Sequence, residues 1–211
     1  MAIEEHPMHA LAHYLPQGSF ENVAYFLHQY RVHLTVTKER KSVLGDYRNA
    51  VHGKNHRITV NGNLNKYAFL ITLLHELAHL LTFEQYGHRV NAHGKEWKKL
   101  YGFLLADFIS KKIFPPDIEH ELKHSLANPA ASSCAEEGLM RILRKYDERK
   151  NGVCFLEELP YGSLFKIKDG RIFQKGEKLR KRFKCSETHT NLVYLFSTIY
   201  EVKPLTEVEK I

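Results

Sequence analysis

The stretch NKYAFLITLLHELAHLLTFEQYG, residues 65–87, decides the fold of this 211-residue chain. Asn65 suits the N-cap position and Gly87 suits a C-terminal stop, so the stretch predicts one helix that ends near Tyr86. Its apolar residues lie on nearly all sides of that helix, which is typical of a buried element. We therefore expect this helix to form the core of a domain.

The motif His75-Glu76-Leu77-Ala78-His79 lies inside this helix. Residues four apart share one helical face, so His75 and His79 can chelate a single metal ion. Glu76 lies one residue further round, where it can reach a water on that metal. Because buried polar side chains need partners, a metal with its water explains all three. The sequence predicts one Zn²⁺, with Glu76 as the catalytic base.

A catalytic zinc usually has a third protein ligand. The extended metzincin pattern needs Gly at position 82 and His at position 85, but the chain has Thr82 and Gln85. His93 is the favoured third ligand, because the turn into the next helix can return it to the metal. Some alternatives remain open, namely His88 and, from later helices, Glu121, Glu136 or Glu137.

The residues around this helix predict an α+β domain over residues 1–150. Alternation of apolar and polar residues indicates a small antiparallel sheet. Its strands are predicted at residues 32–36, 45–49 and 56–60. The last is either an edge that pairs with an extended substrate or a sheet edge without such a role. Helices are predicted at residues 7–14, 20–30 (with Ser19 as its cap), 94–109, 118–126 and 134–150.

After residue 151 the sequence changes to short apolar runs between turns, which predicts a small β-rich domain over residues 151–211. The net charge is +7, and basic residues concentrate between Arg171 and Lys184. This run indicates either a solvated face or a nucleic-acid contact. The candidate contacts are Arg171, Lys175, Lys178, Arg180, Lys181, Arg182 and Lys184.

The composition indicates in which cellular compartment the protein is expected. The three cysteines, Cys134, Cys154 and Cys185, are too few and too widely spaced for a disulfide framework, which favours a reducing compartment. The sequence shows neither a signal peptide nor an apolar run of membrane-spanning length. We therefore expect a cytoplasmic protein with no membrane partner.

The spacing of H-E-x-x-H, about fifteen residues and then H-G-x-x-W resembles the SprT-like metalloprotease family, which includes the Spartan proteases. The matching residues are His75, Glu76, His79, His93, Gly94 and Trp97. The resemblance covers about residues 19–110. It implies a minimal zincin-like fold, three zinc-binding histidines and a catalytic glutamate. For Spartan-type members it also implies cleavage of proteins trapped on DNA.

The chain departs from this family near its C-terminus. Many SprT-like proteins end in a zinc ribbon with paired cysteines, but residues 181–186 contain only Cys185 and no second cysteine follows. We therefore expect one zinc ion and no ribbon. Three functions follow as hypotheses: a zinc endopeptidase acting on proteins bound to nucleic acid, a metallopeptidase indifferent to nucleic acid, and a zinc-containing binding module without proteolytic activity.

Overall fold

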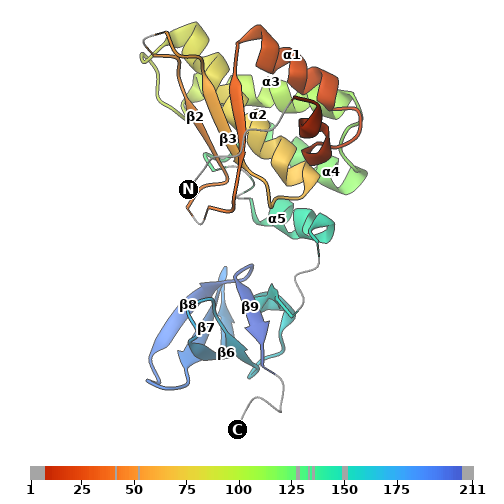
Figure 1. Cartoon of the computed structure of the whole chain (residues 1–211). Coiled ribbons are helices and arrows are strands. Elements are labelled where there is room, and N and C mark those ends of the chain that lie inside the picture. Colours follow the sequence, from red (N-terminus) through yellow and green to blue (C-terminus); the bar gives the residue numbers. More distant parts are fainter. Residues whose placement is uncertain are drawn as a thin grey trace. The chain divides into compact units, whose positions relative to one another are not determined.

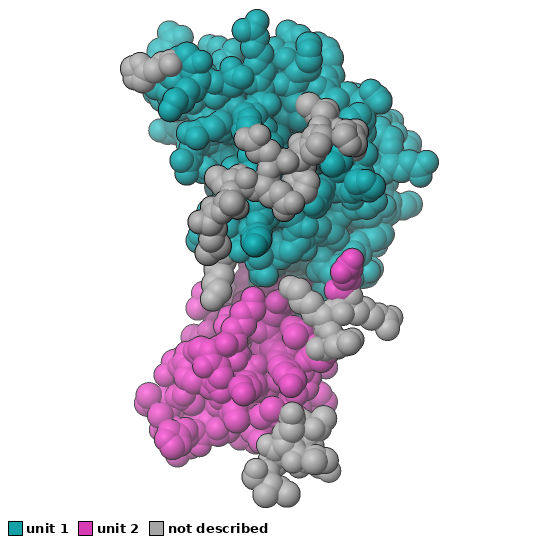
Figure 2. Space-filling view, in the orientation of Figure 1, with its two compact units in different colours: residues 1–147 teal, residues 148–211 magenta. Residues whose placement is uncertain are grey.

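The computed structural model describes residues 8–40, 42–51, 53–126, 129–132, 134, 136–148 and 152–205. The chain divides into two compact units, Met1–Asp147 and Glu148–Ile211 (Figure 2). The first combines helices with a three-stranded sheet, and the second contains a six-stranded sheet. This is an α+β protein with a β-rich C-terminal region, as predicted. The predicted boundary at residue 151 lies outside the described residues.

Helix α2 (Lys66–Tyr86) is the central element of the first unit. Asn65 caps it, because its side-chain oxygen accepts hydrogen bonds from the backbone N–H groups of Tyr67 (3.1 Å) and Ala68 (2.9 Å). Gly87 ends it with a φ of 59°. The helix is buried over most of its length and packs against strands β2 (Gly45–Arg48) and β3 (Arg57–Asn61) and helix α3 (Lys95–Ser110) (Figure 1). Its predicted length and burial are confirmed.

The other helical elements surround α2. They are a 3-10 helix (Met8–Tyr14), α1 (Phe20–Gln29), α3 (Lys95–Ser110), α4 (Pro116–Ser125), α5 (Glu137–Leu143) and a 3-10 turn (Arg144–Tyr146). None of the helices in the described part of the chain is long and apolar enough to cross a lipid bilayer.

Three details of the predicted helices differ. The Ser19 hydroxyl donates to the Pro16 carbonyl at 2.7 Å and does not cap α1. Helix α4 begins at Pro116, two residues before the predicted start, because proline fits the first helical turn. Helix α5 is shorter than predicted, and Lys150 and Pro7, two of the predicted helix ends, lie outside the described residues.

The sheet of the first unit is mixed, and the prediction of an antiparallel sheet was wrong. Its strands are β1 (His33–Thr37), β2 (Gly45–Arg48) and β3 (Arg57–Asn61), in the order β1-β3-β2. Strands β1 and β3 run parallel, while β2 runs antiparallel to β3. Alternation of side chains does not encode strand direction, and the long connection through β2 supplies the crossover that a parallel pair needs. The edge strand predicted at residues 56–60 is in fact the central one.

The second unit is an antiparallel sheet in the order β4-β9-β5-β6-β7-β8. Four phenylalanines, Phe165, Phe173, Phe183 and Phe196, make up half of its buried core residues. The strands are β4 (Cys154–Phe155), β5 (Leu164–Lys166), β6 (Ile172–Leu179), β7 (Arg182–Glu187), β8 (Val193–Ser197) and β9 (Glu201–Pro204), with a 3-10 turn at Leu156–Glu158.

Candidate metal centre

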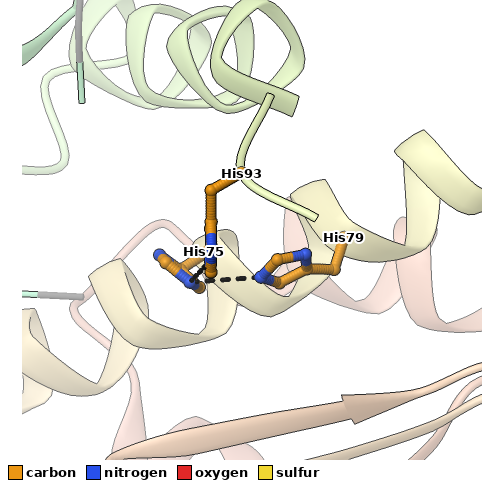
Figure 3. Close-up of side chains that lie close together, drawn as sticks. All are labelled: His75, His79 and His93. Atoms are coloured by element: carbon orange, nitrogen blue, oxygen red, sulfur yellow. Dashed lines mark hydrogen bonds between the residues drawn. The ribbon is translucent and has the colours of Figure 1, made fainter. Parts of the chain in front are cut away.

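The imidazoles of His75, His79 and His93 converge, with one nitrogen of each ring within 4.8 Å of the other two (Figure 3). Nε2 of His75 lies 3.3 Å from Nε2 of His79 and 3.4 Å from Nε2 of His93. His75 is buried, and the other two are partly exposed. Three neutral imidazole nitrogens this close together form a donor set that can hold a metal ion.

Two elements bring these side chains together. His75 and His79 project from one side of α2, and His93 reaches them from the segment before α3 (Figure 3). The fully buried Trp97 of α3 packs against all three rings, with centroid separations of 4.7 Å to His75, 5.3 Å to His79 and 4.7 Å to His93. The indole thus fixes the position of the loop that carries His93 relative to α2.

The alternative third ligands have other partners. His88 packs its ring against Phe83, and Glu136 accepts a hydrogen bond from the backbone of Ala130. Glu137 pairs with Arg141 at 3.2 Å, and the Glu121 carboxylate lies against Gly138 of α5. Among the described residues, only His75, His79 and His93 form a group of three metal-binding side chains.

Burial keeps these imidazoles neutral. It lowers the pKa of His75 to about 3, helped by the neighbouring His79 and His93. It also lowers the pKa of His79 to about 4, and that of His93 falls for the same reason. Neutral imidazole is the form that binds metals, so the site is ready for a cation at neutral pH.

The carboxyl group of Glu76 is buried beside the three histidines, with 5% of the residue exposed. Burial raises its pKa to about 8, the Asp46 carboxylate adds to this rise, and Arg40 opposes it. In the metal-free protein this carboxyl group is therefore mostly protonated at neutral pH, and the positive charge of a bound metal ion would lower its pKa into the range where it can accept and return a proton. The residue predicted to act as a base therefore has an environment suited to that role.

A cavity of about 610 Å³ opens onto this group. It is lined by residues 42–47, by His75, Glu76 and His79, and by Ala92, His93, Ala131 and Ser132. Residues 45–47 belong to β2, which has no second strand partner among the described residues. The sequence analysis missed Gly45, Asp46 and Tyr47, because nothing in their spacing from the histidines marks them as neighbours.

Gly45 is packed directly against Glu76. A Cβ atom at this position would lie 2.5 Å from Oε1 of Glu76 and 2.8 Å from Cγ2 of Thr72. If this is the zinc peptidase site that the sequence predicts, Gly45→Ala should displace the carboxylate, lowering kcat about 10–100-fold and stability by about 1–3 kcal/mol while zinc stays bound. Peptidase kinetics and zinc analysis check this, with Ser132→Ala as a control elsewhere in the cavity. Unchanged kcat in Gly45→Ala would contradict the importance of this contact.

The metal-free protein should become less stable in mild acid. Unfolding lets His75 and His79 take up protons near pH 6.5, whereas the folded imidazoles stay neutral to about pH 4, so stability falls as the pH falls. Glu76 acts in the opposite direction between about pH 8 and pH 4.5, because its folded form holds a proton that the unfolded form loses. Replacing Glu76 with glutamine removes this opposing contribution to the pH dependence of stability.

We therefore expect the unfolding free energy of metal-free Glu76→Gln to fall with decreasing pH more steeply than that of the metal-free wild type. The difference in slope is about 1.4 kcal/mol per pH unit between pH 6 and pH 5, which corresponds to one proton. Urea denaturation at several pH values measures it, and contributions from other groups cancel in the comparison. Equal slopes would mean that the Glu76 carboxyl group is not protonated in the folded apoprotein.

The seven basic candidates of the second unit lie on β6, β7 and the adjoining turns. Lys175 was wrongly predicted, because it is buried and its ammonium group donates to the carbonyl of Leu159 and lies 4.0 Å from the Phe183 ring centroid. Alternation along β6 could have shown that Lys175 shares the inward face of Phe173. Arg171 pairs with Asp169 at 2.9 Å and Lys184 with Glu177 at 3.6 Å. The exposed remainder is Lys178, Arg180, Lys181 and Arg182.

The three cysteines are all free, and most of residues 181–186, the stretch compared above with a zinc ribbon, lies in strand β7 (Arg182–Glu187), where Cys185 is buried.

The fold and the site together define an α+β domain with a three-histidine centre on a buried helix. Residues 8–110 match the model of the SprT-like family, so this part of the chain is similar to that family. The family is generally associated with metallopeptidase-like proteins. No curated protein and no solved structure matches the chain.

Proposed function

We propose that the chain is a zinc-dependent endopeptidase with a zincin-like catalytic unit. The observation that carries this proposal is the convergence of three imidazole nitrogens beside a buried carboxyl group in one cavity. Zinc bonds of 2.0–2.1 Å to imidazole, in tetrahedral arrangement, separate the nitrogens by about 3.3–3.4 Å. The separations of 3.3 and 3.4 Å fit this geometry.

His75, His79 and His93 would hold one Zn²⁺. The bound ion supplies Lewis-acid activation of water and of the substrate carbonyl. Glu76 takes the proton from the attacking water and returns it to the leaving amine. The contact between Glu76 and Gly45 orients the carboxyl group, and Trp97 packs against the three imidazoles and fixes their positions. These roles account for His75 and Glu76, the two ionisable residues that are buried in α2.

The free edge of β2 is the proposed binding site for an extended substrate. Residues 45–47 of this strand line the cavity, so their backbone groups can pair with a peptide lying across the metal centre. This assignment replaces the one predicted for residues 56–60, because β3 is already paired on both sides.

The proposed substrates are proteins bound or crosslinked to DNA. The support is the family match together with the exposed cations Lys178, Arg180, Lys181 and Arg182 near the β6–β7 turn. The test is proteolysis of a DNA-binding protein with and without single-stranded DNA. Cleavage that requires DNA supports the proposal. Equal cleavage without DNA means a general metallopeptidase, and zinc binding without cleavage means a binding module.

A further inference from the structure

The chain contains a second H-E-x-x-H sequence, residues 120–124, which lies on helix α4. Its two histidines are four residues apart, so they share one face of the helix. Nε2 of His120 lies 3.3 Å from Nε2 of His124, and the two ring centroids are 4.7 Å apart. The nitrogens of His75 and His79 in the first motif have the same separation of 3.3 Å. The pair on α4 therefore has the spacing with which two imidazoles share one metal ion.

Helix α4 holds this pair at the surface of the first unit. Ile118 and Leu122 are almost fully buried, and helical geometry places them on the side of α4 opposite the two histidines, which are both exposed. The first turn of the helix is tied down as well, because the Tyr146 hydroxyl donates to the Asp117 carboxylate at 2.7 Å. The packed face fixes the helix, so the two ligands are already in place before an ion binds.

The residues between the two histidines contact other groups. The ammonium group of Lys123 pairs with Glu119 at 2.6 Å, and the Glu121 carboxylate lies against Gly138 of α5. Residues 120–124 do not line the cavity at the three-histidine centre. In the part of the chain that the structure describes, no third metal-binding side chain joins this pair. The second motif thus offers two metal ligands at the surface, without the third ligand and the cavity of the first motif.

We propose that His120 and His124 bind a second divalent transition-metal ion, of the class that includes Zn²⁺, Cu²⁺ and Ni²⁺. Imidazole nitrogen binds these ions in preference to Mg²⁺ and Ca²⁺, which take oxygen ligands. Two protein ligands leave the other coordination positions to water. They also make this site weaker than the three-histidine centre, with a Kd for Zn²⁺ on the order of 10 µM. The site goes beyond the proposed function and does not depend on it.

The experiment is a calorimetric titration of the full chain with ZnCl₂ at a neutral pH. We expect His120→Ala/His124→Ala to bind one zinc ion per chain fewer than the wild type. His120→Ala alone should weaken that ion's binding about 100-fold, because one of its two ligands is lost. The comparison assigns the ion whether or not the three-histidine centre is filled, so this proposal and the proposed function can fail separately.

The matched control is His28→Ala/His189→Ala, which also removes two exposed imidazoles, one from each unit. We expect the control to bind as many zinc ions as the wild type. Loss of the same ion in the control, or equal zinc binding by the wild type and His120→Ala/His124→Ala, would overturn the proposal. Thermal melting verifies that each variant is folded.

A second measurement is needed because a proton shared between the two rings can also bring their nitrogens to this separation. In NMR spectra of the wild type, added Zn²⁺ should shift the ring signals of both His120 and His124. Mg²⁺ at the same concentration should leave them unchanged, since it prefers oxygen ligands. Ring signals that do not respond to Zn²⁺, or that respond equally to both ions, would contradict a two-imidazole metal site.

Discussion

Glu76→Gln is expected to lower kcat of the peptidase by about 10²–10⁴-fold, the usual contribution of a general acid–base group. Glutamine has nearly the same size and keeps a polar group in the buried position, but it cannot take a proton from water. Zinc should stay bound, because the three imidazole ligands are untouched. The measurement is steady-state cleavage of a protein substrate together with the zinc content of the purified protein.

The control for this experiment is Glu84→Gln. Glu84 lies on the same helix, and its carboxylate pairs with His56 rather than facing the metal ligands. We expect this variant to retain most of its activity. If Glu76→Gln cleaved at the wild-type rate, the proton would have to move through another group, and the proposed role of Glu76 would be wrong.

His93→Ala should reduce zinc affinity about 10²–10³-fold. Structural zinc sites with four ligands contribute about 10–16 kcal/mol, so each ligand accounts for roughly 2.5–4 kcal/mol. The loss should abolish activity at ordinary zinc concentrations and also remove the thermal stabilisation that zinc gives the folded state. Competition with a chelating dye measures the affinity, and calorimetry measures the stability.

His88→Ala is the matched control, because His88 was the nearest alternative ligand in the sequence. Its ring packs against Phe83 at a centroid distance of 5.1 Å and is not part of the three-histidine group. We expect this variant to bind zinc as the wild type does. The opposite result, with zinc lost in His88→Ala and kept in His93→Ala, would show that His88 and not His93 is the third ligand.

The part of the metal centre that lies on one helix could be predicted from helical periodicity. His75 and His79 are one turn apart, so their meeting follows from local geometry alone. His93 needed more information, since eighteen residues separate it from His75 and the path of the loop depends on how α3 packs through Trp97. The turn into the next helix favoured His93 over the alternatives, and the resemblance of H-G-x-x-W to a family then supported the same choice.

The sheet was harder to predict, because pairing between distant strands leaves little trace in a single sequence. The alternating residues of β3 fit a central strand as well as an edge, and burial of Ile58 and Val60 on one face fits either. Once β2 is known to be an edge, Gly45 becomes interpretable as the residue that admits the Glu76 carboxyl group. For Lys175, in contrast, the alternation along β6 was sufficient to predict that the side chain faces the core. The prediction of a nucleic-acid contact there rested on its charge alone.

The concentration of the ligands on α2 also bears on how the protein matures in the cell. The helix that organises the core holds the buried His75 and Glu76 and the partly exposed His79, so a chain that folds without metal must enclose polar groups that the ion would otherwise satisfy. Zinc binding would then stabilise the folded state, so chains without zinc would unfold more often and be degraded more readily by cellular proteases. Supply of the metal would thereby set the amount of protein that survives, as well as the fraction that is active.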